Sequence, residues 1–273
     1  MGLGLLKPLN HLAPLLLGLL SMSACFADEP PDDEGLYVGA FGGLGAVQST
    51  SLQQKGAVFL QPPDPSPKLP INAQGSTGSS TDVAVGGLQL GYEWNGWNVG
   101  SNWKLRPAVE LEGIYIGKHS PVGEMPVRPT ALGTQYVTVP TTAGVFLANA
   151  VFTLRTPYSD KIEPYAGIGA GVALVSIRGS DSANPSEPGI NHFNSDSNAS
   201  DTAFAMQAKV GLKGRIGKHL SLFAEYRYLS IDATSYTFGS TDYPGVHLPT
   251  TSWHVDMGRQ QYNLFVAGLQ YKF

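Results

Sequence analysis

Hydrophobic and polar positions alternate with a period of two through most of the chain. The pattern is clearest at the C-terminus, where Phe265, Ala267, Leu269, Tyr271 and Phe273 share one parity and more polar residues occupy the other. Successive side chains of a β-strand point to opposite faces, so this pattern predicts a strand whose faces meet different environments. Seven further strands are predicted, at about 36–46, 87–93, 106–115, 146–155, 167–174, 204–215 and 222–228.

Long and short connections alternate between these eight segments. Short connections lie at about 95–102, 156–161 and 216–219. Long polar stretches lie at about 47–81, 118–137, 179–201 and 239–258. An even number of strands joined in this way predicts an all-β fold, an eight-stranded antiparallel up-and-down β-barrel with every long surface loop at one end.

The two faces of the predicted strands indicate which solvent each one meets. One face is almost entirely Leu, Val, Phe, Tyr and Ala, and the other carries Gly, Ala, Gln and charged residues such as Glu110 and Arg227. Aromatic residues such as Tyr92 and Tyr226 lie on the apolar face near strand ends. This pattern is typical of a transmembrane barrel, apolar outside with aromatic girdles. A soluble β-sandwich is the alternative, but it gives no reason for the alternation of long and short connections.

The composition fits a membrane barrel and excludes several other classes. Only 14% of the residues are charged and 33 of 273 are Gly, against the usual ~25% and ~7%. Strands that turn half their residues to lipid account for the low charge. A net charge of -4 argues against a nucleic-acid partner. A single cysteine excludes an intramolecular disulfide and a cysteine-based zinc cluster.

The N-terminus has the plan of a secretory signal peptide. Lys7 precedes an apolar stretch from Leu12 to Leu20, and small residues follow as far as Ala27. We expect cleavage after Ala27; lipidation at Cys25 is the alternative, because the residues before it loosely resemble a bacterial lipobox. The predicted division is a signal peptide at 1–27, a short periplasmic tail at 28–34 and an outer-membrane barrel at 35–273.

Several segments resemble small opacity-type and OmpA-like outer-membrane barrels. They are Tyr37–Ala40, Pro164–Gly171, Ala224–Tyr228 and the C-terminal strand that ends on Phe. The resemblance implies the outer membrane of a Gram-negative bacterium, contact with lipopolysaccharide, extracellular loops, periplasmic termini and no cofactor. It also implies that the barrel-assembly machinery recognises a C-terminal signal made of Phe265, Leu269, Tyr271 and Phe273. OmpA itself continues into a peptidoglycan-binding domain, and the present sequence stops on its eighth predicted strand.

Parity places a set of charged side chains inside the predicted barrel. An eight-stranded barrel is only wide enough for side chains to fill, and buried charges must be paired. We therefore expect a plug of ion pairs; a gated lumen acting as a small, low-conductance porin-like channel is the alternative. The predicted lumen charge network is Glu93, Arg106, Glu110, Glu112, Arg155, Lys209, Lys213, Glu225, Arg227 and Lys272. The inward Gly167, Gly169 and Gly171 are expected to make room within it.

The long loops are the predicted place of function, because loops on a rigid scaffold commonly carry binding. We expect a non-enzymatic protein whose loops provide an interaction or antigenic surface, with a host or cell-surface ligand as the possible partner. The first loop contains the apolar segment Gly56–Leu60. We interpret it as a hairpin extension or a cap over the barrel mouth, with a contact site as the alternative.

Two groups of residues are candidates for a catalytic or metal site, and the sequence around each argues against it. His219-Leu220-Ser221 resembles the His-x-Ser element of a lipid A deacylase family. It follows a short turn, and no acidic residue stands at the spacing that family requires. The remaining histidines are scattered along the sequence. His247 and His254 are the one pair at ligand spacing, and Asp256 is the one carboxylate beside them. We therefore predict no catalytic residues and no metal site.

Overall fold

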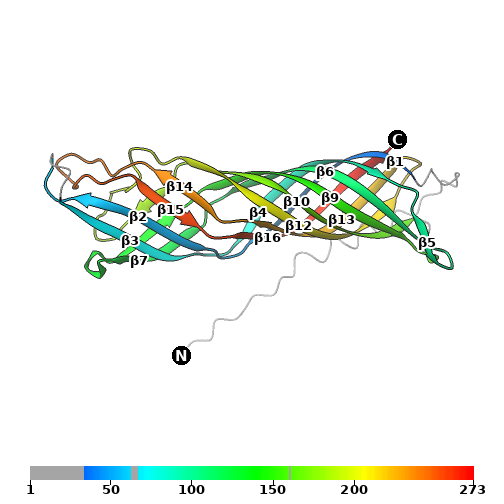
Figure 1. The fold of residues 1–273 in the computed structure, drawn as a ribbon, viewed down its shortest axis with the longest axis horizontal. Coiled ribbons are helices and arrows are strands. Elements are labelled where there is room, and N and C mark those ends of the chain that lie inside the picture. Colours follow the sequence, from blue (N-terminus) through cyan, green and yellow to red (C-terminus); the bar gives the residue numbers. More distant parts are fainter. Residues whose placement is uncertain (1–33, 63–66, 160) are drawn as a thin grey trace, which may run out of the picture. The chain divides into compact units, whose positions relative to one another are not determined.

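Eight long antiparallel strands close into a barrel (Figure 1). The computed structural model describes residues 34–62, 67–159 and 161–273. Each barrel strand pairs with the strands on both sides, and β1 pairs with both β4 and β16, which completes the ring. The barrel strands are β1 (Gly35–Val47), β4 (Ser80–Glu93), β6 (Trp103–His119), β9 (Thr141–Arg155), β10 (Ile162–Ile177), β12 (Ala199–Arg215), β13 (Leu220–Ile231) and β16 (Gln260–Lys272). The predicted eight-stranded antiparallel barrel is confirmed.

The ends of the barrel chain meet at the seam between β1 and β16. Val38 lies opposite Tyr271, and Leu44 lies opposite Phe265. The backbone N–H of Phe273 donates to the carbonyl of Leu36 at 2.9 Å. The seam is therefore hydrogen-bonded along its length, as a closed barrel requires. No helix among the described residues is long and apolar enough to span a membrane. The predicted signal peptide, its cleavage site at Ala27 and residues 28–33 of the predicted tail lie outside the described residues.

The outer face of the barrel is an apolar band. Large hydrophobic side chains stand on every second residue and are exposed, among them Leu88, Leu111, Phe146, Ile168, Leu174, Val210, Leu212 and Phe265. Such a band in contact with water would be costly, and in contact with lipid it is the expected surface of a membrane barrel. The predicted lipid-facing set is therefore on the outside.

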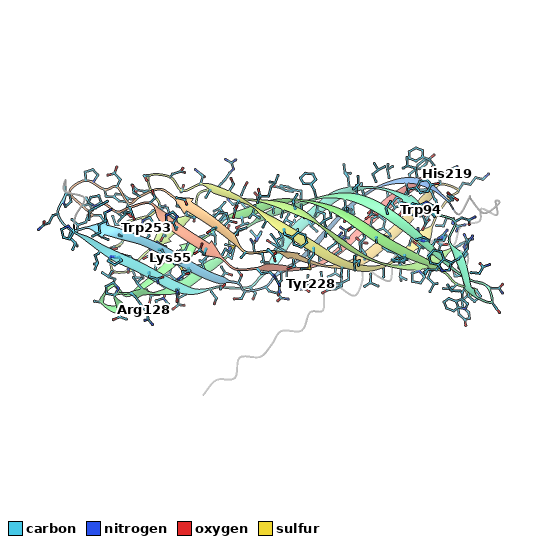
Figure 2. The ribbon with its side chains drawn as sticks, viewed as in Figure 1. Lys55, Trp94, Arg128, His219, Tyr228 and Trp253 are labelled. Atoms are coloured by element: carbon cyan, nitrogen blue, oxygen red, sulfur yellow. The ribbon has the colours of Figure 1, made fainter. Side chains whose placement is uncertain are left out.

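Aromatic residues gather at the end of the barrel that carries the short turns. Tyr92 packs edge-on against Trp94, with ring centroids 5.4 Å apart, and Tyr271 packs edge-on against Phe273 at 5.2 Å. Figure 2 shows Trp94 and His219 at this end. Amphipathic rings prefer the membrane–water boundary. This end also holds β5 (Trp97–Gly100), which pairs with the start of β6.

Seven shorter strands continue the barrel at its other end (Figure 1). They form a second sheet in the order β11-β8-β7-β3-β2-β15-β14, which we call the extension. Each is separated from a barrel strand by a break of two or three residues. The extension strands are β2 (Ser51–Phe59), β3 (Lys68–Thr77), β7 (Val122–Arg128), β8 (Thr134–Thr138), β11 (Asp181–Ala183), β14 (Thr234–Phe238) and β15 (Trp253–Met257). One short 3-10 turn, η1 (Thr130–Leu132), joins β7 to β8.

The extension corrects the prediction of long irregular loops. The stretches 47–81, 118–137, 179–201 and 239–258 contain strands of the second sheet, and β14 precedes the last of them. The segment Gly56–Leu60 lies mostly in β2, which forms a hairpin with β3, in agreement with the hairpin interpretation. The strands were missed because they are short and rich in Ser, Thr, Gln and Gly, which are also typical of loops.

The extension has a polar outer face and an apolar interior. In β15, Trp253, Val255 and Met257 are buried, while His254 points outward. The buried apolar residues of the extension include Leu52, Ile71, Met125, Val127, Val137, Phe193, Tyr236 and Phe238. Burial raises the pKa of Tyr236 to about 12, because the phenolate is poorly solvated there. A polar exterior over an apolar interior is the pattern of a protein in water, so the breaks between barrel and extension mark a change of solvent.

The change of solvent makes a prediction about substitutions on the two outer faces. Ile168→Arg, in the middle of β10, is expected to lower the free energy of unfolding in lipid vesicles by about 2–4 kcal/mol, because the charge would lie at the bilayer midplane. Tyr136→Arg, on the exposed face of β8, is expected to change it by about 0.5 kcal/mol or less. Urea titration of the two variants measures the difference. Equal losses would contradict a lipid-facing band on the barrel alone.

Candidate functional site

The barrel lumen holds the residues that the sequence marked as a charge network. Arg227, on β13, is fully buried (0% exposed). Its Nη1 lies 2.5 Å from Oε1 of Glu112, and its Nε donates to Glu225. Its guanidinium carbon also lies 3.9 Å from the centre of the Phe41 ring, an arrangement that favours a cation. Two carboxylates and one aromatic face thus surround a single guanidinium.

Lys209 on β12 joins this guanidinium cluster to β6. Its Nζ lies 2.5 Å from Oε1 of Glu110 and 3.8 Å from Oε1 of Glu112. Nδ2 of Asn149 donates to both carboxylates, at 3.0 and 3.1 Å. The hydroxyl of Tyr37 donates to Oε2 of Glu110 at 3.0 Å. Buried charges that are both paired and hydrogen-bonded avoid most of the penalty of leaving water.

A second cluster lies nearer the short turns. Glu93 on β4 accepts from Lys272 at 2.7 Å and from Lys213 at 3.4 Å, and Arg106 Nε lies 3.9 Å away. Lys272 is partly exposed, which places this cluster at the edge of the lumen. The ten predicted lumen residues therefore lie on the inward faces of the barrel strands. They group in this cluster and around Arg227, and Arg155 joins them at the edge of the lumen through its ion pair with Glu163.

Glu163 is a member of the network that the sequence analysis missed. It is buried and pairs with Arg106, Arg155 at 3.4 Å and Arg215 at 3.6 Å. The signal was present, because Glu163 has the same parity as the inward Gly167 and precedes it by four residues. The predicted strand at about 167–174 begins later than β10 does, so it leaves out Glu163.

Inward glycines make room for this network. A Cβ at Gly169 would lie 1.8 Å from Oδ1 of Asn149, and one at Gly87 would lie 2.4 Å from Cζ of Phe41. Both distances are far inside van der Waals contact. The charged part of the lumen is closely filled, and a cavity of about 20 Å³ lies among its residues, lined by Tyr37, Glu110 and Lys209 among others. A space of that size holds about one water.

The other half of the lumen is apolar, and this differs from the predicted polar inner face. Every barrel strand contributes a buried aliphatic side chain next to the extension: Val47, Val83, Ile116, Val145, Val175, Ala205, Leu229 and Leu264. They form one hydrophobic core with the interior of the extension. The difference arises because the prediction of a polar inner face rests on the charged residues of each strand, and these lie toward the short turns.

The histidines singled out in the sequence fall in three different surroundings. His219 lies at the short-turn end, where its Nδ1 contacts the carbonyl of Lys272 at 2.8 Å and its ring stacks on Tyr271. His254 points outward from β15 and contacts the hydroxyl of Thr237 at 3.0 Å. His192 and His247 lie together inside the extension, with ring centroids 5.3 Å apart. His247, which is close to His254 in the sequence, therefore meets His192 in the structure.

The outward face of β16 carries the residues of the predicted assembly signal. Phe265, Leu269, Tyr271 and Phe273 are all exposed on the outer face of the barrel. β16 is held on one side by β1 and on the other by β13. The four side chains thus form a continuous apolar strip along the closing strand.

Comparison with known proteins places the sequence in a family. Residues 13–273 match the family model described as outer membrane protein beta-barrel domain. No curated protein matches the sequence. Similar solved structures include Neisserial surface protein A (15% identity, 88% of this chain and 97% of that chain, TM-score 0.39). Others are OprG from Pseudomonas aeruginosa (16%, 90% and 99%, 0.42) and the outer membrane protease OmpT from Escherichia coli (8%, 90% and 99%, 0.42).

The charge network predicts a large effect for its central cation. Arg227→Met would leave Glu112 and Glu225 buried without their partner, and we expect it to lower the free energy of unfolding by about 3–5 kcal/mol. Lys55→Met is the control: its ion pair with Asp256 is about half exposed on both sides, and its loss should cost less than about 1 kcal/mol. Urea unfolding followed by tryptophan fluorescence compares them. Similar small losses in both variants would contradict a network that supports the barrel.

Proposed function

Because the chain belongs to the outer membrane protein β-barrel family, we propose that it is a non-enzymatic, non-conducting outer-membrane protein that presents its extension at the cell surface. The observation that carries this proposal is the extension itself, an ordered sheet with a polar outside and an apolar inside that continues the barrel strands beyond the apolar band. The extension would face the outside of the cell and both ends of the barrel chain the periplasm, as the family resemblance implies. A scaffold of this kind holds a surface in a fixed shape for contact with a partner.

The filled lumen favours display over transport. Ions crossing the barrel would have to pass both the charge network and the apolar half of the lumen. In the apolar half, Ile116, Val145 and Leu264 are fully buried. An ion would have to shed its water to pass such side chains, which is very costly. The small-channel alternative therefore receives no support from the packing.

The geometry around His219 favours a non-enzymatic barrel. The Nδ1 atom of His219 is occupied by the carbonyl of Lys272. A general base of a serine nucleophile normally has that nitrogen oriented by a carboxylate. Ser221 lies on β13, opposite Gln270 and Arg215 in its neighbouring strands. These contacts are those of a turn histidine and a strand serine.

The polar outside of the extension offers a surface suited to hydrogen bonding. Lys55 and Asp256 form an ion pair at 3.2 Å across β2 and β15. Hydrogen bonds from Ser235 and Lys55 hold the pKa of Asp256 below its usual range, so the carboxylate stays charged. Ser235 and Asp256 border a groove of about 580 Å³ that also includes Gln53 and Asp201. We infer that ligands of the extension are polar, with hydroxyl or amide groups.

Conductance separates display from transport. The purified barrel is expected to give no steady current steps in planar lipid bilayers, because its lumen is filled. Steady steps from the wild-type chain that disappear in Glu110→Ala or Arg227→Ala would contradict the proposal and support the channel alternative.

Adhesion tests the extension directly. A barrel-only variant, with 51–77, 122–138, 181–198 and 234–257 replaced by short turns, should still reach the outer membrane, because the barrel pairings and the charge network are retained. Escherichia coli cells displaying the full chain are expected to adhere to epithelial monolayers, and cells displaying the barrel-only variant are expected to adhere no better than cells without either chain. Heat-modifiable mobility on gels confirms that both chains are folded. Equal adherence of the two would count against the extension as the binding surface.

A further inference from the structure

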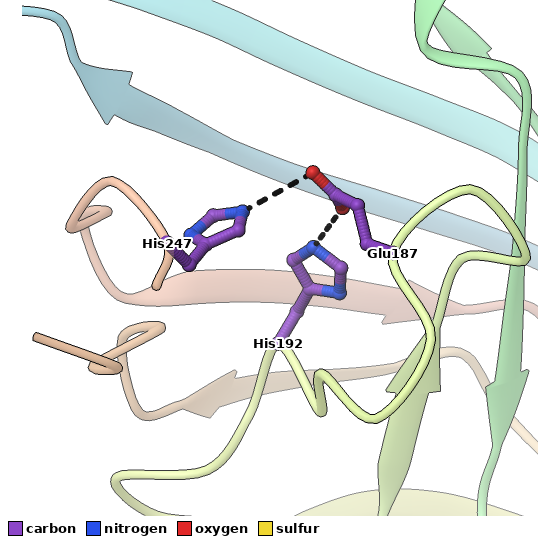
Figure 3. Close-up of side chains that lie close together, drawn as sticks. All are labelled: Glu187, His192 and His247. Carbon is purple, nitrogen blue, oxygen red and sulfur yellow. Dashed lines mark hydrogen bonds and ion pairs between the residues drawn. The ribbon is translucent and has the colours of Figure 1, made fainter. Parts of the chain in front are cut away.

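Two histidines and a glutamate from separate segments meet inside the extension (Figure 3). Glu187 and His192 lie between β11 and β12, and His247 lies between β14 and β15. Nε2 of His192 is 3.1 Å from Oε2 of Glu187, and Nε2 of His247 is 3.5 Å from Oε1 of the same carboxylate. The three ligand atoms all lie within 4.8 Å of one another.

The hydrogen bonds of the two rings fix which nitrogen faces the carboxylate. Nδ1 of His192 lies 2.7 Å from the carbonyl oxygen of Ser182, and Nδ1 of His247 lies 2.5 Å from the carbonyl oxygen of Leu248. A carbonyl only accepts, so both hydrogens are on Nδ1. Gln135 Nε2, 3.1 Å from Nδ1 of His192, donates to the hydroxyl of Ser182 at 2.8 Å. In a neutral ring, Nε2 then turns its lone pair toward Glu187.

Two nitrogen lone pairs facing one carboxylate need a positive charge between them. With both rings neutral all the facing atoms are acceptors, and acceptors at 3.1 and 3.5 Å repel unless a proton or a metal ion lies among them. Histidines that donate Nδ1–H to a carbonyl and offer Nε2 are the usual form of histidine metal ligands. Ligand atoms of a tetrahedral zinc ion are about 3.3 Å apart, close to both measured distances.

The surroundings of the cluster fit a bound ion. His192 is buried, and its ring packs edge-on against Trp253 at 6.0 Å. The glutamate side chain is 37% exposed, so an ion could enter from solvent. The cluster borders a cavity of about 70 Å³ lined also by Val58, Leu132 and Trp253. This is room for an ion with water, and Gln54, Gln135 and Asn184 add polar groups to the lining.

We propose that the extension binds a divalent transition-metal ion of the zinc class through Nε2 of His192, Nε2 of His247 and the carboxylate of Glu187. Two imidazoles and one carboxylate suit zinc, and they leave a fourth position for water or an external ligand. The site replaces the sequence-based expectation of no metal site, which could not connect residues 187, 192 and 247 across the intervening sequence.

The ion would join two irregular segments of the extension, 184–198 between β11 and β12 and 239–252 between β14 and β15. These segments already touch through the hydroxyl of Thr241, which donates to the carbonyl of His192 at 3.0 Å, and through Asn194 and Asp242. A ligand that binds only the folded form stabilises it. Zinc is therefore expected to protect both segments from proteolysis.

Isothermal titration of the full chain tests the site. The protein is purified in detergent without a histidine tag, treated with EDTA and titrated with zinc chloride. One zinc ion per chain is expected, and His192→Ala, His247→Ala and Glu187→Gln should each weaken binding at least tenfold. His254→Ala is the matched control, since this histidine points outward from β15, and it should bind zinc as the wild type does.

Cobalt gives a second readout that does not depend on the variants folding. Cobalt(II) added to the metal-free wild type should produce the visible absorption of a four-coordinate site, and zinc should remove it. Absence of stoichiometric zinc binding, or an equal loss in His254→Ala, would overturn the proposal. So would variants that bind zinc normally while keeping heat-modifiable mobility, because the cluster would then be held by a proton instead.

Discussion

The need to pair every backbone group in the membrane governs the rest of the structure. In lipid an unpaired strand edge has no water to satisfy it, and the ring closes where β16 meets β1. Closure with eight strands sets a narrow lumen that side chains must fill. Paired charges with inward glycines among them fill the part of the lumen near the short turns, and aliphatic side chains fill the part next to the extension.

The same strands cross from one solvent to another without losing their direction. Between β15 and β16, for example, the break is two residues long, and across it the exposed residues change from apolar, such as Phe265, to polar, such as His254. The interior is apolar on both sides of the boundary in this half of the molecule, so one hydrophobic core runs through it. What changes at the boundary is the outer face alone.

The barrel could be predicted from the sequence because its pattern is strong and local. In β16 the alternation from Phe265 to Phe273 specifies the lipid face by itself, and the parity of Glu110 and Arg227 follows from their neighbours. The extension was not predictable in the same way, since residues such as Ser235, Thr237 and Gln53 are as common in loops as in short exposed strands. Glu163 was missed through a strand boundary, the least certain part of any such pattern. The meeting of His192 with His247 depends on how two distant segments fold over the core, and no local spacing encodes it.

The short breaks between barrel and extension have a mechanical consequence. Because each extension strand is joined to a barrel strand by a break of two or three residues, these junctions leave no slack between the part in water and the part in lipid. A pull on the extension would load the hydrogen-bonded ladders along the strand direction, where many bonds share the force and must fail together. The extension would then behave as a rigid continuation of the barrel and not as a domain on a flexible tether.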